Sequence, residues 1–274
     1  MTDAYAVFGN PIGHSKSPHI HAAFARACGQ DMTYRAIEAP IGGFAAALAA
    51  FRAAGGRGAN VTAPFKLDAF AAADELSERA RAAGAANALK FEGRRTLAEN
   101  FDGLGLVRDI ETNLDAPIRG KRVLLLGAGG AARGAAPAIL ARAPAQLTIA
   151  NRDLAKARAL VEAFAALGPV EASSYAELSA GRPFDFVLNS TSASWSGESP
   201  PVPTSCFARG ALAYELAYGK GLTPFLAAAR AAGAGRLADG VGMLVEQAAE
   251  AFAWWRGVRP ETGAVIAELT VPLG

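Results

Sequence analysis

The chain has 274 residues, of which 51% are hydrophobic, and its 27 basic and 25 acidic side chains leave a formal charge of only +2. This length predicts two domains with a core each, and the near-neutral charge provides no basic surface that would attract nucleic acid. Gly, Arg or Pro interrupts every apolar stretch, so we expect no membrane span, and the first residues predict no secretory leader. Two distant cysteines, Cys28 and Cys206, predict no disulfide and a cytoplasmic protein.

The first part of the chain alternates short apolar strands with helical segments, which is typical of an α/β fold with mostly parallel sheets. Strands are expected at residues 4–9, 32–38 and 56–62, and helices at 17–29 and 39–56. The first of these helices has Ser17 as its expected N-cap, Pro18 at its first position and Gly29 at its far end. Each helix therefore connects two strands, as a parallel sheet requires.

A hairpin and a further helix follow in the sequence. Residues 86–100 predict two strands around the turn at Glu92 and Gly93, and residues 101–113 predict a helix. The stretch 113–121 is polar, contains Pro and Gly, and is interpreted as a connection between domains. After it a second α/β series begins with KRVLLLGAGG, continues through QLTIANR and FDFVLNSTS, and reaches GALAYELAY.

The most informative local motif is RVLLLGAGGAARG, in which an apolar strand runs directly into a glycine-rich turn and then a helix. Gly127 permits the tight turn, Gly129 lets backbone amides approach a pyrophosphate, and Ala132 allows close packing of the helix on the strand. The motif predicts a dinucleotide site. The alternative is a glycine-rich turn that binds no ligand.

The end of the next strand indicates which dinucleotide is bound. An acidic residue there would bind the ribose 2′-hydroxyl of NAD, but Arg152 and Lys156 stand in its place. Two cations suit a 2′-phosphate, so the sequence favours NADP. Asp153 lies beside them and could repel the phosphate or cap the following helix, and an exposed helix start with scattered charges is the alternative.

Two further strand ends carry polar residues. Asn60 and Thr62 end one strand, with Lys66 in the first turn of the expected next helix, whereas Asn100 and Asp102 precede another helix. Taken singly, Lys66 is a surface charge and Asp102 an N-cap. Together they could form a pair for proton transfer, which a dehydrogenase needs because the carbonyl oxygen gains a proton as the C–H bond forms.

All three histidines, His14, His19 and His21, lie in the stretch GNPIGHSKSPHIH. His19 and His21 are two positions apart in a predicted helix and face different directions, and no histidine elsewhere could complete a site. We therefore expect no metal site and interpret the histidines as framework.

The motifs together resemble those of the shikimate dehydrogenases, within the shikimate/quinate dehydrogenase family. The segments that carry the resemblance are GNPIGHSKSPHIH, ANVTAPFK, GAANAL, ENFDG, GAGGAARG, ANRDLAKA, LNSTS, AYGKGLTPF and ADGVGMLVEQAAEAF, in the family's order. The resemblance implies reduction of 3-dehydroshikimate to shikimate by NADPH in aromatic amino acid biosynthesis. It also implies a substrate domain of residues 1–102 plus 239–274, whose C-terminal helices return to it, a Rossmann-type NADP domain of residues 103–238, and an active site in the cleft between them.

Carried over residue by residue, the resemblance makes Lys66 and Asp102 the catalytic pair, with Lys66 as the proton donor. Ser15 and Ser17 would hold the substrate carboxylate beside the start of a helix, which itself attracts anions. The other substrate-binding residues would be Asn60, Thr62, Asn87, Tyr218 and Gln247. The cofactor would contact Gly127, Ala128, Gly129, Gly130, Ala131, Asn151, Arg152, Lys156, Thr191, Leu216 and Gly240, with Ser192 and Met243 near the nicotinamide.

Two positions depart from the family's pattern. Phe101 stands where the family usually has Thr, which removes a hydroxyl and adds an apolar ring beside the expected base. Asp153 stands where the family's NADP motif usually has Thr, which could relax the preference for NADP. Two alternatives therefore stay open: a quinate or quinate/shikimate dehydrogenase with relaxed cofactor use, and a nucleotide-sensing protein without catalysis. A monomer and a homodimer are both compatible with the sequence.

Overall fold

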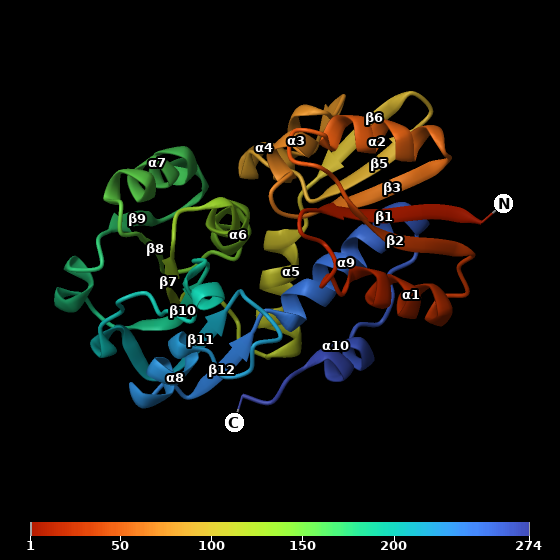
Figure 1. Ribbon diagram of the computed structural model, residues 1–274. Helices are drawn as coiled ribbons and strands as arrows, with labels where there is room; N and C mark the ends of the chain where they lie inside the picture. Colours follow the sequence, from red (N-terminus) through yellow and green to blue (C-terminus); the bar gives the residue numbers. More distant parts are fainter. Residues whose placement is uncertain (1, 274) are drawn as a thin grey trace. The chain divides into compact units, whose positions relative to one another are not determined.

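The computed structural model describes residues 2–273, which form two compact units. The first unit reaches to Gly105 and takes in Val245–Val265, and the second holds Leu106–Leu244 and the residues from Ile266 onward. Each unit is built on its own sheet (Figure 1). The α/β class predicted from the sequence is confirmed.

The first unit contains a mixed sheet. Its strands are β1 (Asp3–Gly9), β2 (Met32–Glu38), β3 (Gly56–Val61), β4 (Glu75–Leu76), β5 (Ala88–Glu92) and β6 (Arg95–Glu99), in the order β2-β1-β3-β5-β6-β4. Its helices include α1 (Ser17–Ala27), α2 (Phe44–Ala53), α3 (Lys66–Ala71) and α4 (Glu78–Ala83). β1 pairs in parallel with β2 and β3, whereas β5 runs antiparallel to β3 and β6. A hairpin turn at Gly93, whose φ is +59°, joins β5 to β6.

Apolar side chains bury both faces of this sheet. On α2, Phe44, Leu48 and Phe51 recur at helical spacing and pack with Phe8 of β1. A second cluster joins Tyr5, Ala88, Phe101, Ala251 and Trp255, in which Trp255 comes from the C-terminal part of the chain. Burial of these rings from distant segments gives the unit its own core.

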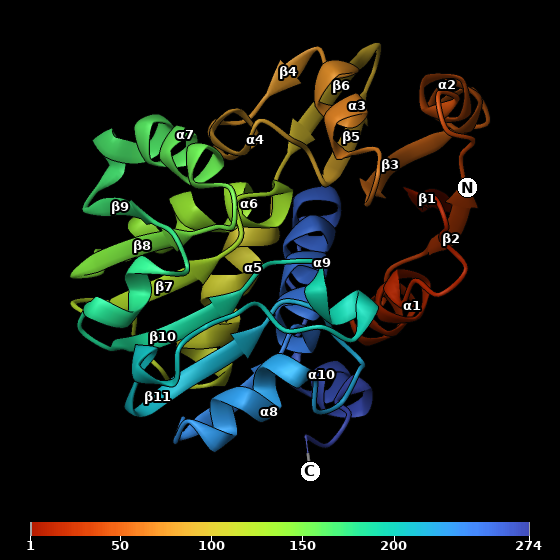
Figure 2. The ribbon, with the colours of Figure 1, turned by 60° about the vertical axis from the view of Figure 1, so that its left-hand side comes forward.

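The second unit has a parallel sheet. Its strands are β7 (Arg122–Leu126), β8 (Gln146–Ala150), β9 (Val170–Ser173), β10 (Phe184–Asn189), β11 (Phe207–Glu215) and β12 (Arg236–Asp239), in the order β12-β11-β10-β7-β8-β9. Its helices include α6 (Gly130–Leu140), α7 (Leu154–Phe164) and α8 (Pro224–Ala231), and short helical turns lie at Ala165–Leu167, Glu177–Ala180, Ala193–Ser196 and Thr204–Cys206. Figure 2 shows α6 and α7 beside β7, β8 and β9.

This strand order is that of the doubly wound dinucleotide-binding fold, with β7 as its first strand. The chain reverses its direction of winding between the neighbouring strands β7 and β10. Ligands of such sheets bind at the carboxyl ends of the strands at that point, so the turns after Leu126 and Asn189 are where a dinucleotide is expected.

Three helices are divided between the units. They are α5 (Asp102–Arg108), which continues as a π-helical turn (Asp109–Asn113), α9 (Val241–Arg256) and α10 (Gly263–Leu269). The expected return of C-terminal helices to the first domain is confirmed for α9 from Val245 onward. The units differ from the predicted division at three places, since 103–105 group with the first unit, and 239–244 and 266–273 with the second. In the last of these segments Leu273 packs against the apolar core of the second unit. Among the described helices, none has both the length and the apolarity of a membrane span.

The start of α1 differs in detail from the prediction. Lys16, not Ser17, occupies the N-cap, and the side chain of Lys16 accepts no capping hydrogen bond. Ser17 is the first helical residue and is buried, so Pro18 occupies the second helical position and not the predicted first. Ser15 supplies the missing acceptor instead, since its Oγ accepts a hydrogen bond from Ser17 N at 3.3 Å.

Candidate functional site

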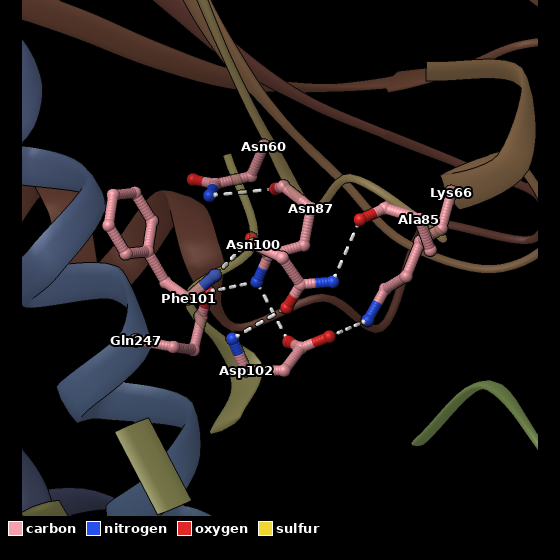
Figure 3. A network of polar contacts seen from close by, with 8 residues as sticks. All are labelled: Asn60, Lys66, Ala85, Asn87, Asn100, Phe101, Asp102 and Gln247. Atoms are coloured by element: carbon pink, nitrogen blue, oxygen red, sulfur yellow. Dashed lines mark hydrogen bonds and ion pairs between the residues drawn. The ribbon is translucent and has the colours of Figure 1, made fainter. Parts of the chain in front are cut away.

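Lys66 and Asp102 form a direct ion pair in the first unit. Lys66 begins α3 and Asp102 begins α5, and Lys66 Nζ lies 2.5 Å from Asp102 Oδ2 (Figure 3). The Asp102 side chain is 11% exposed and that of Lys66 is 33% exposed, so the carboxylate is nearly buried while the ammonium group reaches solvent. The structure therefore brings together the two residues that the sequence predicted as a proton-transfer pair.

Asn87 holds the other oxygen of the Asp102 carboxylate. Its Nδ2 donates to Asp102 Oδ1 at 2.8 Å and to Gln247 Oε1 at 3.2 Å, and its Oδ1 accepts from Phe101 N at 2.9 Å. The amide orientation is fixed because each of its ends meets a matching partner. Asn87 and Gln247, both predicted as substrate-binding residues, thus lie beside the catalytic pair (Figure 3).

Asn100, rather than Asp102, satisfies the start of α5. Asn100 Oδ1 accepts from Asp102 N at 3.1 Å, and Asn100 Nδ2 donates to Ala85 O at 3.0 Å. The interpretation of Asp102 as an N-cap is wrong, since this carboxylate faces Lys66 and Asn87. The Asn100 contacts instead leave the Asp102 carboxylate available for chemistry.

Asn60 is part of the framework behind this cluster. It is 5% exposed, its Oδ1 accepts from Tyr34 Oη at 2.7 Å and lies 3.1 Å from His21 Nε2, and its Nδ2 donates to the Asn87 carbonyl at 3.2 Å. Thr62, at the end of the same strand, is partly exposed. Of these two predicted substrate residues, Thr62 offers the more accessible side chain.

His21 is buried in an aromatic box. Its ring stacks on Tyr34 at a centroid distance of 4.1 Å, and Trp255 lies at 5.4 Å. Burial lowers the pKa of His21 to about 3, and the Asn60 contact opposes this shift only in part. Because the Asn60 amide nitrogen already donates to Asn87, His21 Nε2 carries the proton and donates to Asn60 Oδ1.

Replacing His21 by glutamine should remove part of the protein's acid sensitivity. The folded pKa of His21 lies below the usual unfolded value of about 6.5, so its contribution to stability is complete above that pH and is lost as the pH falls toward 3. Between pH 6.5 and 5 this loss is about 2 kcal/mol. Urea unfolding at pH 7 and pH 5 measures it: wild type should lose that much more than H21Q, and equal losses would contradict a buried neutral imidazole.

Phe101 points its ring into the apolar core of the first unit. The residue is 3% exposed, its ring meets Trp254 edge-on at 5.8 Å, and the Arg79 guanidinium lies 5.5 Å from the ring centroid. Figure 3 shows the ring on the side away from the contact between Lys66 and Asp102. The departure from the family's Thr therefore adds core packing and places no apolar ring against the catalytic pair.

Restoring threonine at position 101 should therefore cost stability. Exchange of a buried phenylalanine for a much smaller residue removes apolar contact and leaves a cavity, and we expect F101T to lower the free energy of unfolding by about 3 kcal/mol. Urea titration of both proteins measures this difference. An unchanged midpoint would show that the ring makes no core contact in solution.

Ser15 and Ser17 differ in accessibility. Ser15 is partly exposed at the turn before α1, whereas Ser17 is 7% exposed. His14 and His19 are exposed on either side of them. Ser15 is therefore the more accessible of the two hydroxyls predicted to hold a carboxylate.

In the second unit the glycine-rich turn has the predicted backbone geometry. Gly127 has φ of +102°, and a Cβ there would lie 3.0 Å from Ser190 Oγ and 3.1 Å from Thr191 Cγ2. Only glycine meets both conditions without strain. Ala132 is fully buried, as expected for close packing of α6, and α6 begins at Gly130 with its N–H groups beside the turn.

A cavity of about 460 Å³ lies next to this turn. It is lined by Ala128, Gly129, Arg133, Asn151, Arg152, Asp153, Lys156 and Ala159. Five of the predicted cofactor positions, those other than Arg133, Asp153 and Ala159, therefore share one cavity. Its three basic side chains suit a polyanionic ligand.

Arg133 is the lining residue that the sequence reasoning missed. It stands in the first turn of α6, where the helix dipole disfavours a cation. A basic residue at that place is itself a signal of a nearby anion. Asp153, by contrast, caps α7, since its Oδ1 accepts from Ala155 N at 3.1 Å, so the capping alternative for Asp153 is confirmed.

The remaining cofactor positions meet at the carboxyl ends of β10, β11 and β12. Leu216 N donates to Asn189 O at 2.9 Å, and Asn189 Oδ1 accepts from Thr191 N and Oγ1. A Cβ on Gly240 would lie 2.2 Å from Leu216 O, so these backbones approach as only glycine permits. Thr191, Leu216 and Gly240 are thus neighbours in the second unit.

Tyr218 and Met243 also belong to the second unit. Burial raises the pKa of the half-buried Tyr218 hydroxyl, and Met243 N donates to Tyr214 Oη at 3.3 Å.

Within residues 2–273, no group of three or more His, Cys, Asp or Glu side chains is arranged to hold a metal ion.

Comparisons with known proteins identify the family. Residues 7–89 match the model of the shikimate dehydrogenase substrate binding domain, residues 110–196 that of shikimate / quinate 5-dehydrogenase, and residues 240–270 that of the shikimate 5′-dehydrogenase C-terminal domain. A shikimate dehydrogenase (NADP⁺) of Dechloromonas aromatica is 58% identical over 100% of this chain and 99% of its own length.

Solved structures agree with this match. An Ael1 enzyme from Pseudomonas putida has 59% identity and a TM-score of 0.95, with 99% of this chain and 100% of that one covered. The shikimate 5-dehydrogenase of Thermus thermophilus, in complex with NADP(H) and shikimate, has 30% identity and a TM-score of 0.87, with 97% of each chain covered. The chain therefore belongs to the shikimate dehydrogenase family.

Proposed function

We propose that the chain catalyses the reversible, NADPH-dependent reduction of 3-dehydroshikimate to shikimate. The observation that carries the proposal is the ion pair between Lys66 and Asp102, held by Asn87, in a chain whose second unit has a basic dinucleotide cavity. Full-length relatives named shikimate dehydrogenase (NADP⁺) support it. The reaction serves aromatic amino acid biosynthesis.

The residues of the first unit supply the proton. NADPH, when bound, supplies a hydride to the carbonyl carbon of the substrate. Lys66 then gives a proton to the carbonyl oxygen, and the Asp102 carboxylate stabilises the ammonium form of Lys66 beforehand and orients it. In the opposite direction the neutral amine of Lys66 accepts the hydroxyl proton. Because the side chain is one-third exposed, solvent returns a proton to Lys66 after reduction and takes one from it after oxidation.

Substrate recognition is assigned to polar side chains with matching chemistry. Ser15 and Ser17 bind the substrate carboxylate, and Thr62, Asn87, Gln247 and Tyr218 bind ring hydroxyls. Hydroxyl and amide groups both donate and accept hydrogen bonds, as a polyol requires. Asn60 contributes through its buried contacts with Asn87.

The cofactor is NADP, in agreement with the names of the relatives and with an NADP-bound neighbour. The glycine-rich turn with Ala128, Gly130 and Ala131 receives the pyrophosphate, and the cavity residues Asn151, Arg152 and Lys156 receive the 2′-phosphate. Because the Asp153 carboxylate is turned to the helix amide, it caps α7 much as Thr would.

Domain roles, compartment and assembly complete the proposal. We assign residues 1–102 with 239–274 to the substrate domain and 103–238 to the NADP domain. The two compact units divide the chain at slightly different points, since 103–105 group with the first unit, and 239–244 and 266–273 with the second. The cytoplasm is the proposed compartment, consistent with free thiols at Cys28 and Cys206. The chain acts as a monomer or a homodimer, which sedimentation of the purified protein distinguishes.

The test is absorbance at the nicotinamide band with 3-dehydroshikimate or 3-dehydroquinate, each offered with NADPH and with NADH. Of the four combinations, we expect rapid enzymatic oxidation only for NADPH with 3-dehydroshikimate. Comparable rates on both acids would replace the proposal by a quinate/shikimate dehydrogenase, and binding of NADPH without turnover on either acid would indicate a nucleotide sensor.

A further inference from the structure

Glu215 is a buried carboxylate in the second unit that the proposed mechanism does not use. It ends β11 and is 0% exposed. Its Oε2 accepts hydrogen bonds from Ser194 Oγ, from Asn189 Nδ2 at 3.0 Å and from Thr223 Oγ1 at 3.3 Å, and its Oε1 accepts from Ala217 N at 3.3 Å. Burial raises the pKa of Glu215, and these four donors act in the opposite direction.

The carboxylate decides which way the Asn189 amide points. A carboxylate only accepts hydrogen bonds, so the Asn189 NH₂ group must face it. Asn189 Oδ1 is thereby directed to Thr191, where it accepts from Thr191 N at 3.1 Å and from Thr191 Oγ1 at 2.7 Å. The backbone position and hydroxyl orientation of Thr191 thus depend on Glu215 through one intermediate side chain.

The segments that Glu215 connects are those at the predicted nicotinamide end of the cofactor site. Thr191 lies against the turn at Gly127, and the Leu216 backbone bonds to Asn189 O while touching Gly240. Thr223, which Glu215 also binds, caps α8 through Leu226 N. One side chain therefore joins the ends of β10 and β11 to the start of α8.

We propose that Glu215 is a positioning residue that holds Thr191 and Leu216 in the arrangement that binds the nicotinamide half of NADPH. The inference rests on the proposed function, because it assumes that these residues meet the nicotinamide. It does not concern the adenosine half, whose cavity contains none of the residues that Glu215 contacts.

The first test is Glu215→Gln, which keeps the size of the side chain and removes its charge. The new amide must place its NH₂ group against a donor in either orientation. If it faces Asn189, the Asn189 amide turns and Thr191 loses its acceptor; if it faces Ala217 N, the backbone after Leu216 is displaced. We expect kcat to fall about tenfold or more, which is the effect of losing one well-placed hydrogen bond in a buried site. The primary isotope effect with deuterated NADPH should rise, whereas the Kd of 2′,5′-ADP should stay within about twofold.

The second test restores the pattern of donors and acceptors. In the double variant N189D/E215Q, the amide introduced on β11 donates to the carboxylate introduced on β10, and the other oxygen of that carboxylate again accepts from Thr191. This variant should regain most of kcat and the wild-type isotope effect. Leu178→Ala is the matched control, because it weakens the apolar core of the same unit without touching the Glu215 contacts, and it should lower Tm while leaving kcat unchanged.

Three results would overturn the proposal: an unchanged kcat in E215Q, equal losses of affinity for NADPH and 2′,5′-ADP, or no recovery in the double variant. If E215Q does not fold, Thr191→Val tests the same contact, and an unchanged kcat in that variant would likewise overturn the proposal.

A wild-type protein that fails to reduce 3-dehydroshikimate would instead refute the proposed function. The nicotinamide fluorescence of bound NADPH, compared between wild type and E215Q, then still reports on Glu215, and identical spectra would overturn its role.

Discussion

Replacing Lys66 by alanine is expected to lower kcat by about 10²- to 10⁴-fold and to change KM little, because positioned proton transfer contributes that much in the transition state. In the proposed mechanism the Lys66 ammonium group, which is hydrogen-bonded to Asp102, is the general acid. Alanine has no group that could protonate the carbonyl oxygen. Steady-state rates with NADPH and 3-dehydroshikimate measure the effect.

The control is Lys121→Ala, which removes an exposed lysine whose ammonium lies 3.9 Å from an Asp185 carboxylate oxygen. This variant should retain wild-type kcat, since exposed ion pairs contribute little. A rise in KM alone in K66A would reduce Lys66 to a binding residue and remove the central step of the proposed mechanism.

Replacing Arg152 by alanine is expected to raise the KM for NADPH by about 10- to 100-fold and to leave the KM for NADH nearly unchanged. Arg152 lines the basic cavity with Lys156 and Arg133, and a charge-assisted bond to a phosphate is worth about 1.5–3 kcal/mol. Initial rates with each cofactor at saturating 3-dehydroshikimate measure the two constants.

Arg158→Ala is the matched control, since Arg158 lies on α7, the helix that follows Arg152, and does not line the cavity. Its cofactor constants should equal those of wild type. If R152A lost NADPH and NADH equally, Arg152 would bind a group common to both cofactors, and the assignment of the 2′-phosphate would fail.

The sequence predicts the elements of this fold well where local chemistry determines them. The strand into GAGG and the hairpin turn at Gly93 form as expected, and the capping alternative for Asp153 is confirmed, because each depends on neighbouring residues. The ion pair between Lys66 and Asp102 was predictable only as a combination, since each residue by itself has an ordinary surface or capping role.

The errors occur where a distant contact decides the outcome. Asn100 rather than Asp102 satisfies α5 because the Lys66 ammonium and the Asn87 amide bind the Asp102 carboxylate, and both come from other elements. The ring of Phe101 enters the core because Trp254 lies beside it, 153 positions further along the chain. No local pattern shows either contact.

Glu215 and Arg133 illustrate the same limit at the cofactor site. Glu215 ends a strand in a stretch that shows no motif. Only one of its four donors, Ala217 N, is a near neighbour in the sequence; the side chains of Asn189, Ser194 and Thr223 reach it through the fold. Arg133 lies within the glycine-rich motif itself, but its place in the cavity depends on the loop after β8. Strand order, rather than spacing along the chain, brings these groups together.

The most direct test of the central claim is mass spectrometry of shikimate formed from 3-dehydroshikimate and NADPH deuterated at both C4 positions, with enzyme and cofactor in equal amounts. The proposed reaction predicts one deuterium in each shikimate molecule formed by wild type, and negligible shikimate from K66A in the same time. Unlabelled shikimate, or NADPH that stays fully deuterated and unoxidised beside wild type, would contradict hydride transfer by this protein.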